Sequence, residues 1–291
     1  MCHPREGGDP ESCLENWIPA FAGMTQEIKF FMNIFKNTLL FLLLLITSCS
    51  SGTTTLFSDP TQVGVDSTND RVFVIQGDRQ VFAFTASTLA EIGDQPVVDE
   101  TDNETVFDLM PTVTTYFAVY STSTSSRLFV LGSLTDDSGN VVLNRIRVLD
   151  FDGTTFTEAS FSPIILSDGD DATTDSDNSF TGMVLDQANS VLYVSDASAA
   201  VVHAISAVDG TEVTTPIAIA GVPQGMSLAD SHLYVCNDST EETEQLITAI
   251  DVSDFSTTTI DLDIPCSQVA AQSNGTSVIL LVRNADTQSL L

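Results

Sequence analysis

Short apolar runs separated by clusters of turn-forming residues recur along the chain, and they are clearest between Gly182 and Ile219. This stretch contains apolar runs at 183–185, 191–194, 200–207 and 213–219. The runs are rich in β-branched and aromatic residues, whereas Asp, Asn, Ser and Gly fill the gaps, which is typical of short strands joined by turns. The alternation therefore predicts a four-stranded antiparallel meander.

The meander is one copy of a repeat. Residues from Gly225 to Asp251 follow the same order, with a Gly-Met opening, a short apolar strand, a polar turn and Leu-Tyr-Val. Weaker copies align on the second strand of each unit, at 72–74, 128–130, 192–194, 233–235 and 279–281. The two shortest spacings match the roughly 40–45 residues of a four-stranded propeller blade. Acidic insertions at 99–108 and 167–179 account for the longer spacings.

A single four-stranded sheet cannot bury both of its faces, so neighbouring units must stack on it. The sequence thus predicts an all-β fold, a β-propeller of four-stranded antiparallel blades. The expected blades lie near 63–110, 116–166, 181–219 and 225–262, with an incomplete one at 267–291. Either residues 53–57 complete the last blade or the chain is part of a longer propeller. The abrupt end after Leu291 favours the second alternative, which predicts exposed apolar faces at the ends of the row of blades.

Two segments carry a family resemblance. Leu192 to Asp196, followed by the strand Val201 to Ile205, resembles the YVTN family of β-propeller repeats, as does Leu233 to Asn237. Ser195 and Cys236 stand where the family pattern has Thr, and the other copies keep only its apolar skeleton. The resemblance implies a propeller fold over most of 63–291 and an exported bacterial protein, and it does not specify an activity.

The N-terminal part reads as an export signal. Residues 32–48 combine the basic Lys36 with an apolar run at 38–46 that is shorter than the roughly 20 residues of a spanning helix, as in a signal peptide. Leu45 to Cys49 resembles a bacterial lipobox, in which the Cys is acylated and becomes the first mature residue. We expect lipidation of Cys49, a polar tether at 49–62, and a mis-called upstream segment at 1–31. An ordinary signal peptide with an incidental Cys is the alternative.

The charge balance limits the partners. The chain has 9 basic and 40 acidic residues, a net charge of −31, and no Lys after Lys36. Such a surface repels nucleic acid and keeps a protein soluble. The expected partners are therefore the membrane, through the lipid anchor, and a protein or small-molecule ligand, with no nucleic acid.

Cys236 and Cys266 are candidates for a disulfide. Export permits disulfides, and the end of a second strand and the end of a fourth strand emerge on the same face of a meander. Cys236 ends the second strand of the fourth unit, and Cys266 lies in the connection to the fifth. The alternative is a pair of free thiols.

An acidic loop is the strongest candidate for a metal site. Its carboxylates are oxygen ligands of the kind that calcium prefers, although their spacing does not match an EF-hand. The residues concerned are Asp168, Asp170, Asp171, Asp175 and Asp177. A solvated acidic loop is the favoured interpretation, with calcium as the one cofactor that the sequence suggests.

Other chemistry is sparse. His203 and His232 are predicted to be surface residues, and no phosphate-binding Gly-rich loop or nucleophile elbow is present. Asp66 and Asp186 are the only acids at the ends of predicted first strands, where carboxylates could converge on a propeller axis. No catalytic residue is assigned.

Three functions remain open at this point. The favoured one is a non-enzymatic, membrane-anchored lipoprotein of the cell envelope, whose propeller acts as a binding or scaffold module facing the periplasm or the exterior. The second is a propeller enzyme of lactonase or hydrolase type. The third is a calcium-dependent, adhesin-like surface protein that uses the acidic insertions.

Overall fold

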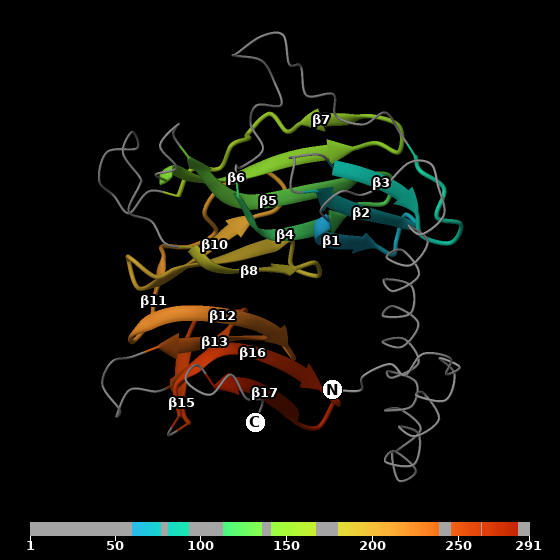
Figure 1. Cartoon of the computed structure of the whole chain (residues 1–291). Coiled ribbons are helices and arrows are strands. Elements are labelled where there is room, and N and C mark those ends of the chain that lie inside the picture. Colours follow the sequence, from blue (N-terminus) through green and yellow to red (C-terminus); the bar gives the residue numbers. More distant parts are fainter. Residues whose placement is uncertain are drawn as a thin grey trace, which may run out of the picture. The chain divides into compact units, whose positions relative to one another are not determined.

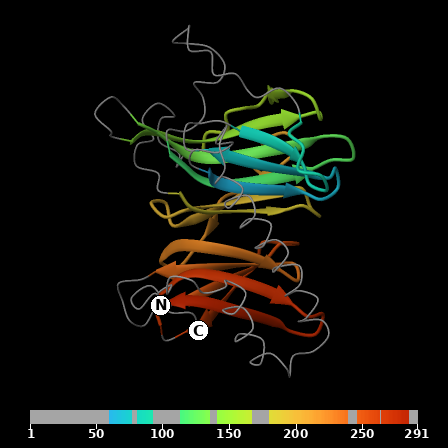
Figure 2. The same cartoon turned by 45° about the vertical axis from the view of Figure 1, so that its right-hand side comes forward.

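The computed structural model describes residues 60–76, 81–92, 113–135, 141–166, 180–238, 246–262 and 264–284. All of the regular secondary structure within these ranges is β-strand, and the strands form antiparallel sheets in chain order (Figures 1 and 2). None of these residues belongs to a helix with the length and apolarity that membrane crossing requires.

Five sheets succeed one another along the chain. The first contains β1 (Pro60–Asp66), β2 (Arg71–Gln76) and β3 (Val81–Thr85). The second contains β4 (Val113–Ser121), β5 (Ser126–Thr135), β6 (Val141–Phe151) and β7 (Phe156–Glu158). The third contains β8 (Phe180–Asp186), β9 (Val191–Asp196), β10 (Val201–Ser206) and β11 (Ile217–Ala218). The fourth contains β12 (Val222–Ala229), β13 (His232–Asp238), β14 (Leu246–Asp251) and β15 (Thr257–Asp261), and the fifth contains β16 (Cys266–Ser273) and β17 (Val278–Asn284).

The order of strands within each sheet is a meander. Each strand pairs with the next one in sequence, and the first strand of each sheet contacts the first strand of the following sheet. Meander sheets that follow one another through their first strands make this chain a β-propeller of about five blades. The predicted fourth strand of the third sheet was too long: only Ile217–Ala218 is a strand, directly after Pro216, which has no N–H to donate.

One large side chain on the second strand of each of the first four sheets holds the stack together. It lies directly across from a residue of the first strand, on the face that meets the following sheet: Phe73 opposite Gly64, Phe129 opposite Ala118, Tyr193 opposite Val184, and Tyr234 opposite Ser227. All four side chains are buried, with relative exposures of 0%, 0%, 0% and 7%. Each belongs to a separate apolar cluster that includes residues of its own sheet and of the next. The core is thus a series of layers between sheets.

The two terminal faces of this series are exposed. Leu281 takes the same position in the fifth sheet, opposite Ala270 and three residues before the bulge pair, so the sequence alignment of 279–281 with 72–74 was wrong by one residue. Leu281 is 45% exposed, and Ile279 on the same strand is 61% exposed. At the other end, Val63 and Val65 of β1 are 43% and 56% exposed.

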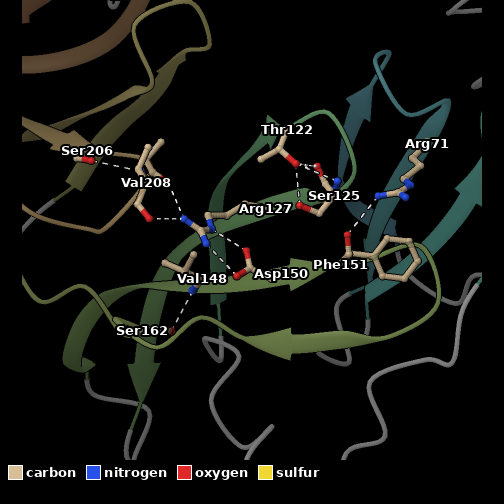
Figure 3. A network of polar contacts seen from close by, with 11 residues as sticks. Arg71, Thr122, Ser125, Arg127, Val148, Asp150, Phe151, Ser162, Ser206 and Val208 are labelled. Atoms are coloured by element: carbon tan, nitrogen blue, oxygen red, sulfur yellow. Dashed lines mark hydrogen bonds and ion pairs between the residues drawn. The ribbon is translucent and has the colours of Figure 1, made fainter.

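Arginines reinforce the layers between the first three sheets (Figure 3). Arg71 begins β2 and donates to Ser126 Oγ at 3.0 Å and to the Phe151 carbonyl at 3.2 Å, both in the second sheet. Arg127 holds the same position in β5, where it pairs with Asp150 at 2.6 Å and donates to the Val208 carbonyl, which follows β10 in the third sheet, at 2.6 Å. Each guanidinium therefore bonds a backbone carbonyl of the following sheet.

A matched pair of substitutions tests this packing. Replacing Phe129 by Ala removes a buried ring and should lower the free energy of unfolding by about 3–5 kcal/mol. Replacing Leu281 by Ala at the equivalent exposed position should cost less than about 1 kcal/mol. Chemical denaturation of both variants measures the difference. Equal losses at the two positions would contradict the layered packing.

Candidate functional site

A β-bulge interrupts the first strand of every sheet, close to the start of that strand. The pairing register shifts at Pro60/Gln62, Thr114/Tyr116, Phe180/Gly182, Pro223/Met226 and Cys266/Gln268. Bulges bend a strand and redirect side chains, and they are frequent beside functional sites. Five bulges at corresponding places mark one end of the first strands as the place to look for a site.

Two glycines allow successive bulges to approach each other. A Cβ on Gly182 would lie 2.9 Å from Ser195 Oγ and 3.1 Å from the Gln224 carbonyl oxygen. A Cβ on Gly225 would lie 3.0 Å from Gln268 Cα and 3.1 Å from the Ser267 carbonyl oxygen. The Gly of each Gly-Met pair is therefore required by the backbone of the following sheet.

Hydrogen bonds connect the bulges of neighbouring sheets. The Tyr116 hydroxyl donates to the Thr181 carbonyl, and Thr181 Oγ1 donates to the Pro223 carbonyl at 2.6 Å. The Ser195 hydroxyl donates a further hydrogen bond to the Gln224 carbonyl, at 3.3 Å. Burial raises the pKa of Tyr116, so that its hydroxyl remains a neutral donor. These bonds fix the bulges as a rigid rim.

A pocket of about 570 Å³ opens at this rim. Its walls are formed by the bulges of the second to fifth sheets and by the outer face of β17. The lining residues are Tyr116, Phe180, Thr181, Gly182, Met183, Gln224, Gly225, Met226, Ser267, Gln268, Val269, Ala270, Leu281 and Arg283. We call this cavity the bulge pocket.

The chemistry of the bulge pocket is amide, hydroxyl and thioether. Gln224 of β12 and Gln268 of β16 are the two amide residues of the lining, and Met183 and Met226 supply flexible apolar surface. Arg283 is the one charged residue of the lining, and its Nη1 lies 3.5 Å from Gln268 Oε1. The lining contains no Asp, Glu, His or Cys. It offers hydrogen bonds and apolar contact, without a general base or a nucleophilic thiol.

A disulfide lies at the edge of the pocket. Cys236 of β13 and Cys266 of β16 are bonded to each other, with their Cα atoms 5.4 Å apart, and both are buried. Cys266 directly precedes the lining residues Ser267 and Gln268. The bond therefore ties the fifth sheet to the fourth where the pocket needs both.

Asp66 and Asp186 do not converge on an open space. Asp66 Oδ1 accepts the backbone N–H groups of Thr68 and Asn69, and its Oδ2 accepts the hydroxyl of Ser126 at 2.6 Å. Burial acts to raise the pKa of Asp66, but the hydrogen bonds from Ser126 and Asn69 outweigh it and the pKa is lowered. Asp186 accepts the same backbone bonds from its own turn. Both carboxylates hold hairpin turns.

The prediction for His203 was wrong. Its side chain is 1% exposed, because it lies on the inner face of β10 opposite Val194. Nδ1 lies 2.9 Å from Glu212 Oε1, and Nε2 lies 4.0 Å from Asp196 Oδ2. His232, by contrast, is 40% exposed. In the described ranges, no three His, Cys or acidic side chains are placed to hold a metal ion.

Several predicted residues lie outside the described part of the chain. They are Cys49 and the acidic residues Asp168, Asp170, Asp171, Asp175 and Asp177. Lipidation and calcium binding therefore stay predictions from sequence.

The bulge pocket was not predicted. In the sequence, the Gly-Met pairs at 182–183 and 225–226 mark only the opening of the repeat. A polar residue directly before each Gly, Thr181 and Gln224, was the signal that could have indicated it, because a central strand has little reason to begin with half-buried polar groups.

Comparison with known proteins establishes the fold alone. The β-propeller domain of Cps50 (Swd1) from Myceliophteria thermophila matches with a TM-score of 0.51 and 10% identity, over 80% of this chain and 72% of that one. BamB from Moraxella catarrhalis matches at 0.41 and 15% identity, over 79% and 59%. A chain from the nidogen/laminin complex matches at 0.45 and 12% identity, over 75% and 70%. No family model and no curated protein sequence matches the chain.

Removal of the disulfide should loosen this end of the molecule. Closing a loop with a sequence separation of 30 residues is worth about 3–4 kcal/mol in the chain-entropy estimate. We expect the double variant Cys236→Ala, Cys266→Ala to lose stability of that order in chemical denaturation. Alkylation and peptide mass mapping without reductant show directly whether Cys236 and Cys266 are bonded. Alkylation of both cysteines in the untreated protein would contradict the bond.

Proposed function

We propose that this chain is a lipid-anchored protein of the bacterial cell envelope, whose β-propeller binds an extended peptide segment of a partner protein in the bulge pocket. The observation that carries the proposal is the lining of the pocket: two glutamines from neighbouring strands beside apolar methionines, on a rim joined by hydrogen bonds.

The amides of Gln224 and Gln268 suit a peptide backbone. A carboxamide carries both a donor and an acceptor, as a peptide group does, so each can bond one backbone unit of an extended chain. They extend from neighbouring strands and share the pocket with Met183 and Met226, which can adapt to side chains of different shapes. Extended segments are commonly bound through hydrogen bonds to their main chain, while pockets for their alternate side chains provide specificity.

The pocket is less suited to the other ligand classes. Hydrolytic chemistry needs a general base or a metal, and the lining residues include no acid, His or Cys. A highly anionic ligand would meet a single guanidinium, Arg283, on a chain of net charge −31. A neutral or cationic segment pays no such electrostatic cost.

The anchor part of the proposal rests on sequence. The apolar run at 38–46 and the lipobox-like Leu45 to Cys49 favour export and acylation, and the resemblance to YVTN repeats agrees with an exported protein. One acyl chain gives only marginal membrane binding, so stable anchoring requires more than one on Cys49.

Peptide binding can be tested without knowing the partner. A displayed library of unstructured peptides is selected on the purified chain, and the enriched peptides are titrated against variants. Gln224→Ala and Gln268→Ala should each weaken binding about three- to tenfold, as expected for a net hydrogen bond of about 0.5–1.5 kcal/mol.

The matched control is Gln272→Ala. Gln272 is exposed and lies on β16, as Gln268 does, but it does not line the pocket. It should leave peptide affinity unchanged. Failure to enrich any peptide, or equal affinity for the wild type and Gln224→Ala, would overturn the peptide-binding proposal.

Acylation has a direct assay. Cells expressing the chain are supplied with a labelled fatty acid, and the membrane fraction is collected. The wild type should carry the label and sediment with membranes, whereas Cys49→Ser should do neither, since its hydroxyl does not form the thioether that holds the lipid. Ser51→Ala is the control and should behave as the wild type. Label on Cys49→Ser would exclude anchoring at this residue.

A further inference from the structure

His203 is a buried imidazole between two carboxylates. Its side chain lies on β10 and is 1% exposed. Nδ1 lies 2.9 Å from Oε1 of Glu212, which follows in the loop after β10, and Nε2 lies 4.0 Å from Oδ2 of Asp196, the last residue of β9. The Asp196 side chain is also 1% exposed, whereas that of Glu212 is 43% exposed. Each ring nitrogen therefore faces a carboxylate oxygen.

A neutral imidazole cannot satisfy both contacts, because one of its nitrogens is a donor and the other an acceptor. Either tautomer directs a nitrogen lone pair at a carboxylate oxygen, which is itself an acceptor. Asp196 Oδ1 already accepts the N–H groups of Ser198 and Ala199, while neither Asp196 Oδ2 nor His203 Nε2 has a hydrogen-bond partner within the described ranges. The 4.0 Å contact is too long for a hydrogen bond, so its attraction depends on charge. An imidazolium is the form of the ring that presents an N–H and a positive charge to both carboxylates.

The second sheet has a permanent cation at the same register position. Arg147 on β6 and His203 on β10 each lie across from the residue that follows the large second-strand side chain. Their carboxylate partners, Glu158 and Glu212, also correspond, because each pairs with the residue two positions further along the third strand. Arg147 donates to Glu158, and its side chain is 3% exposed. Burial, and then the neighbouring Arg145, lower the pKa of Arg147 to about 10, so it remains charged at neutral pH. The repeat thus places a buried cation beside this glutamate.

We propose that the folded protein holds His203 as an imidazolium between Asp196 and Glu212, and that this proton fastens the end of β9 and the loop after β10 to the middle of β10. We call the three residues the His203 latch. Loss of the proton would leave the buried carboxylate of Asp196 beside a nitrogen lone pair, without a compensating charge. The segments that the latch joins would then open locally as the pH rises.

The other ionisable groups on the elements around the ring are engaged elsewhere. Within the described ranges they are Tyr116, Arg127 and Asp150 of the second sheet, Asp186 of β8, and Asp209 of the loop after β10. Arg127 pairs with Asp150 at 2.6 Å, and Asp186 and Asp209 accept hydrogen bonds from their own turns. Burial raises the pKa of Tyr116, so its hydroxyl stays neutral. The charges that His203 meets are therefore those of Asp196 and Glu212.

The His203 latch adjoins the bulge pocket. Asp196 lies opposite Phe180, which precedes the bulge of β8 and lines the pocket. Release of the end of β9 would therefore loosen one wall of the pocket. The inference rests on the latch residues and does not depend on what the pocket binds.

The nitrogen chemical shifts of the imidazole rings report the protonation directly. The full chain, with Cys49→Ser so that no acyl chain is attached, is labelled with ¹⁵N-histidine and titrated from about pH 5 to about pH 8, where histidines change charge. Single Gln substitutions of His203 and His232 assign the signals. Both ring nitrogens of His203 should remain protonated at a pH where the exposed His232 has lost one proton. A His203 ring with a single proton wherever His232 is neutral would overturn the proposal.

Glu212→Gln removes one of the two charges and keeps the shape of the side chain. His203 should then lose its proton at a lower pH than in the wild type. Glu158→Gln is the matched control, because Glu158 holds the corresponding position in the second sheet, and it should leave the signals of His203 unchanged. An identical His203 titration in the wild type and in Glu212→Gln would contradict the latch.

Chemical denaturation at several pH values measures what the latch contributes. The folded chain keeps a proton that a histidine of the unfolded chain releases near about pH 6.5, so stability is full below that pH and falls as the pH rises. The denaturation midpoint should therefore fall toward about pH 8 in the wild type and in His232→Gln, and fall less in His203→Gln. At the higher pH, the amides of 180–183 should exchange with solvent faster than at the lower pH after correction for the intrinsic rates.

If His203→Gln does not fold, Glu212→Gln takes its place, because the Glu212 side chain is partly exposed and its substitution leaves no cavity. Equal pH dependence of the midpoint in the wild type and in the latch variant would overturn the proposal.

Discussion

The burial of one large second-strand side chain against the following sheet is the interaction on which this propeller depends. Phe73, Phe129, Tyr193 and Tyr234 repeat at one register position, and each fills a layer that no single sheet could close. Because each layer joins only neighbouring sheets, stability is close to a sum of nearest-neighbour terms. The same logic explains why Leu281, at the corresponding position, is exposed: its half of the layer has no counterpart among the described sheets.

The bulge pocket is a consequence of the same stacking. First strands that approach each other closely need glycine where the backbone of the next sheet passes, as at Gly182 and Gly225. A bulge at this point turns polar groups toward the rim, and those groups bond the carbonyls of the next bulge. The polar residues that remain, chiefly Gln224 and Gln268, line the pocket. The close packing of the first strands and their bulges thus places several hydrogen-bonding groups at one end of the propeller.

The fold was largely predictable because its signal is local and repeated. Leu-Tyr-Val and the turn clusters mark strands wherever they occur, and the meander follows from short connections. The site was not predictable, because a bulge depends on the register between two strands, which no single strand encodes. His203 shows the same limit: its strand was predicted, but its burial and its contact with Glu212, which follows the strand in a loop, were not. Asp66 and Asp186 were placed correctly at strand ends, yet their hydrogen-bond partners, three residues on, direct them into turns.

Native-state hydrogen exchange measures the layered packing most directly, because it reports the opening free energy of each strand. In dilute solution, the amides of β5 and β9, which lie between two layers, should exchange only through global unfolding. The amides of β17, which is covered on one face, should exchange through a smaller local opening. Protection of β17 equal to that of β9 would contradict the claim that each sheet is held by the layer that the next one closes.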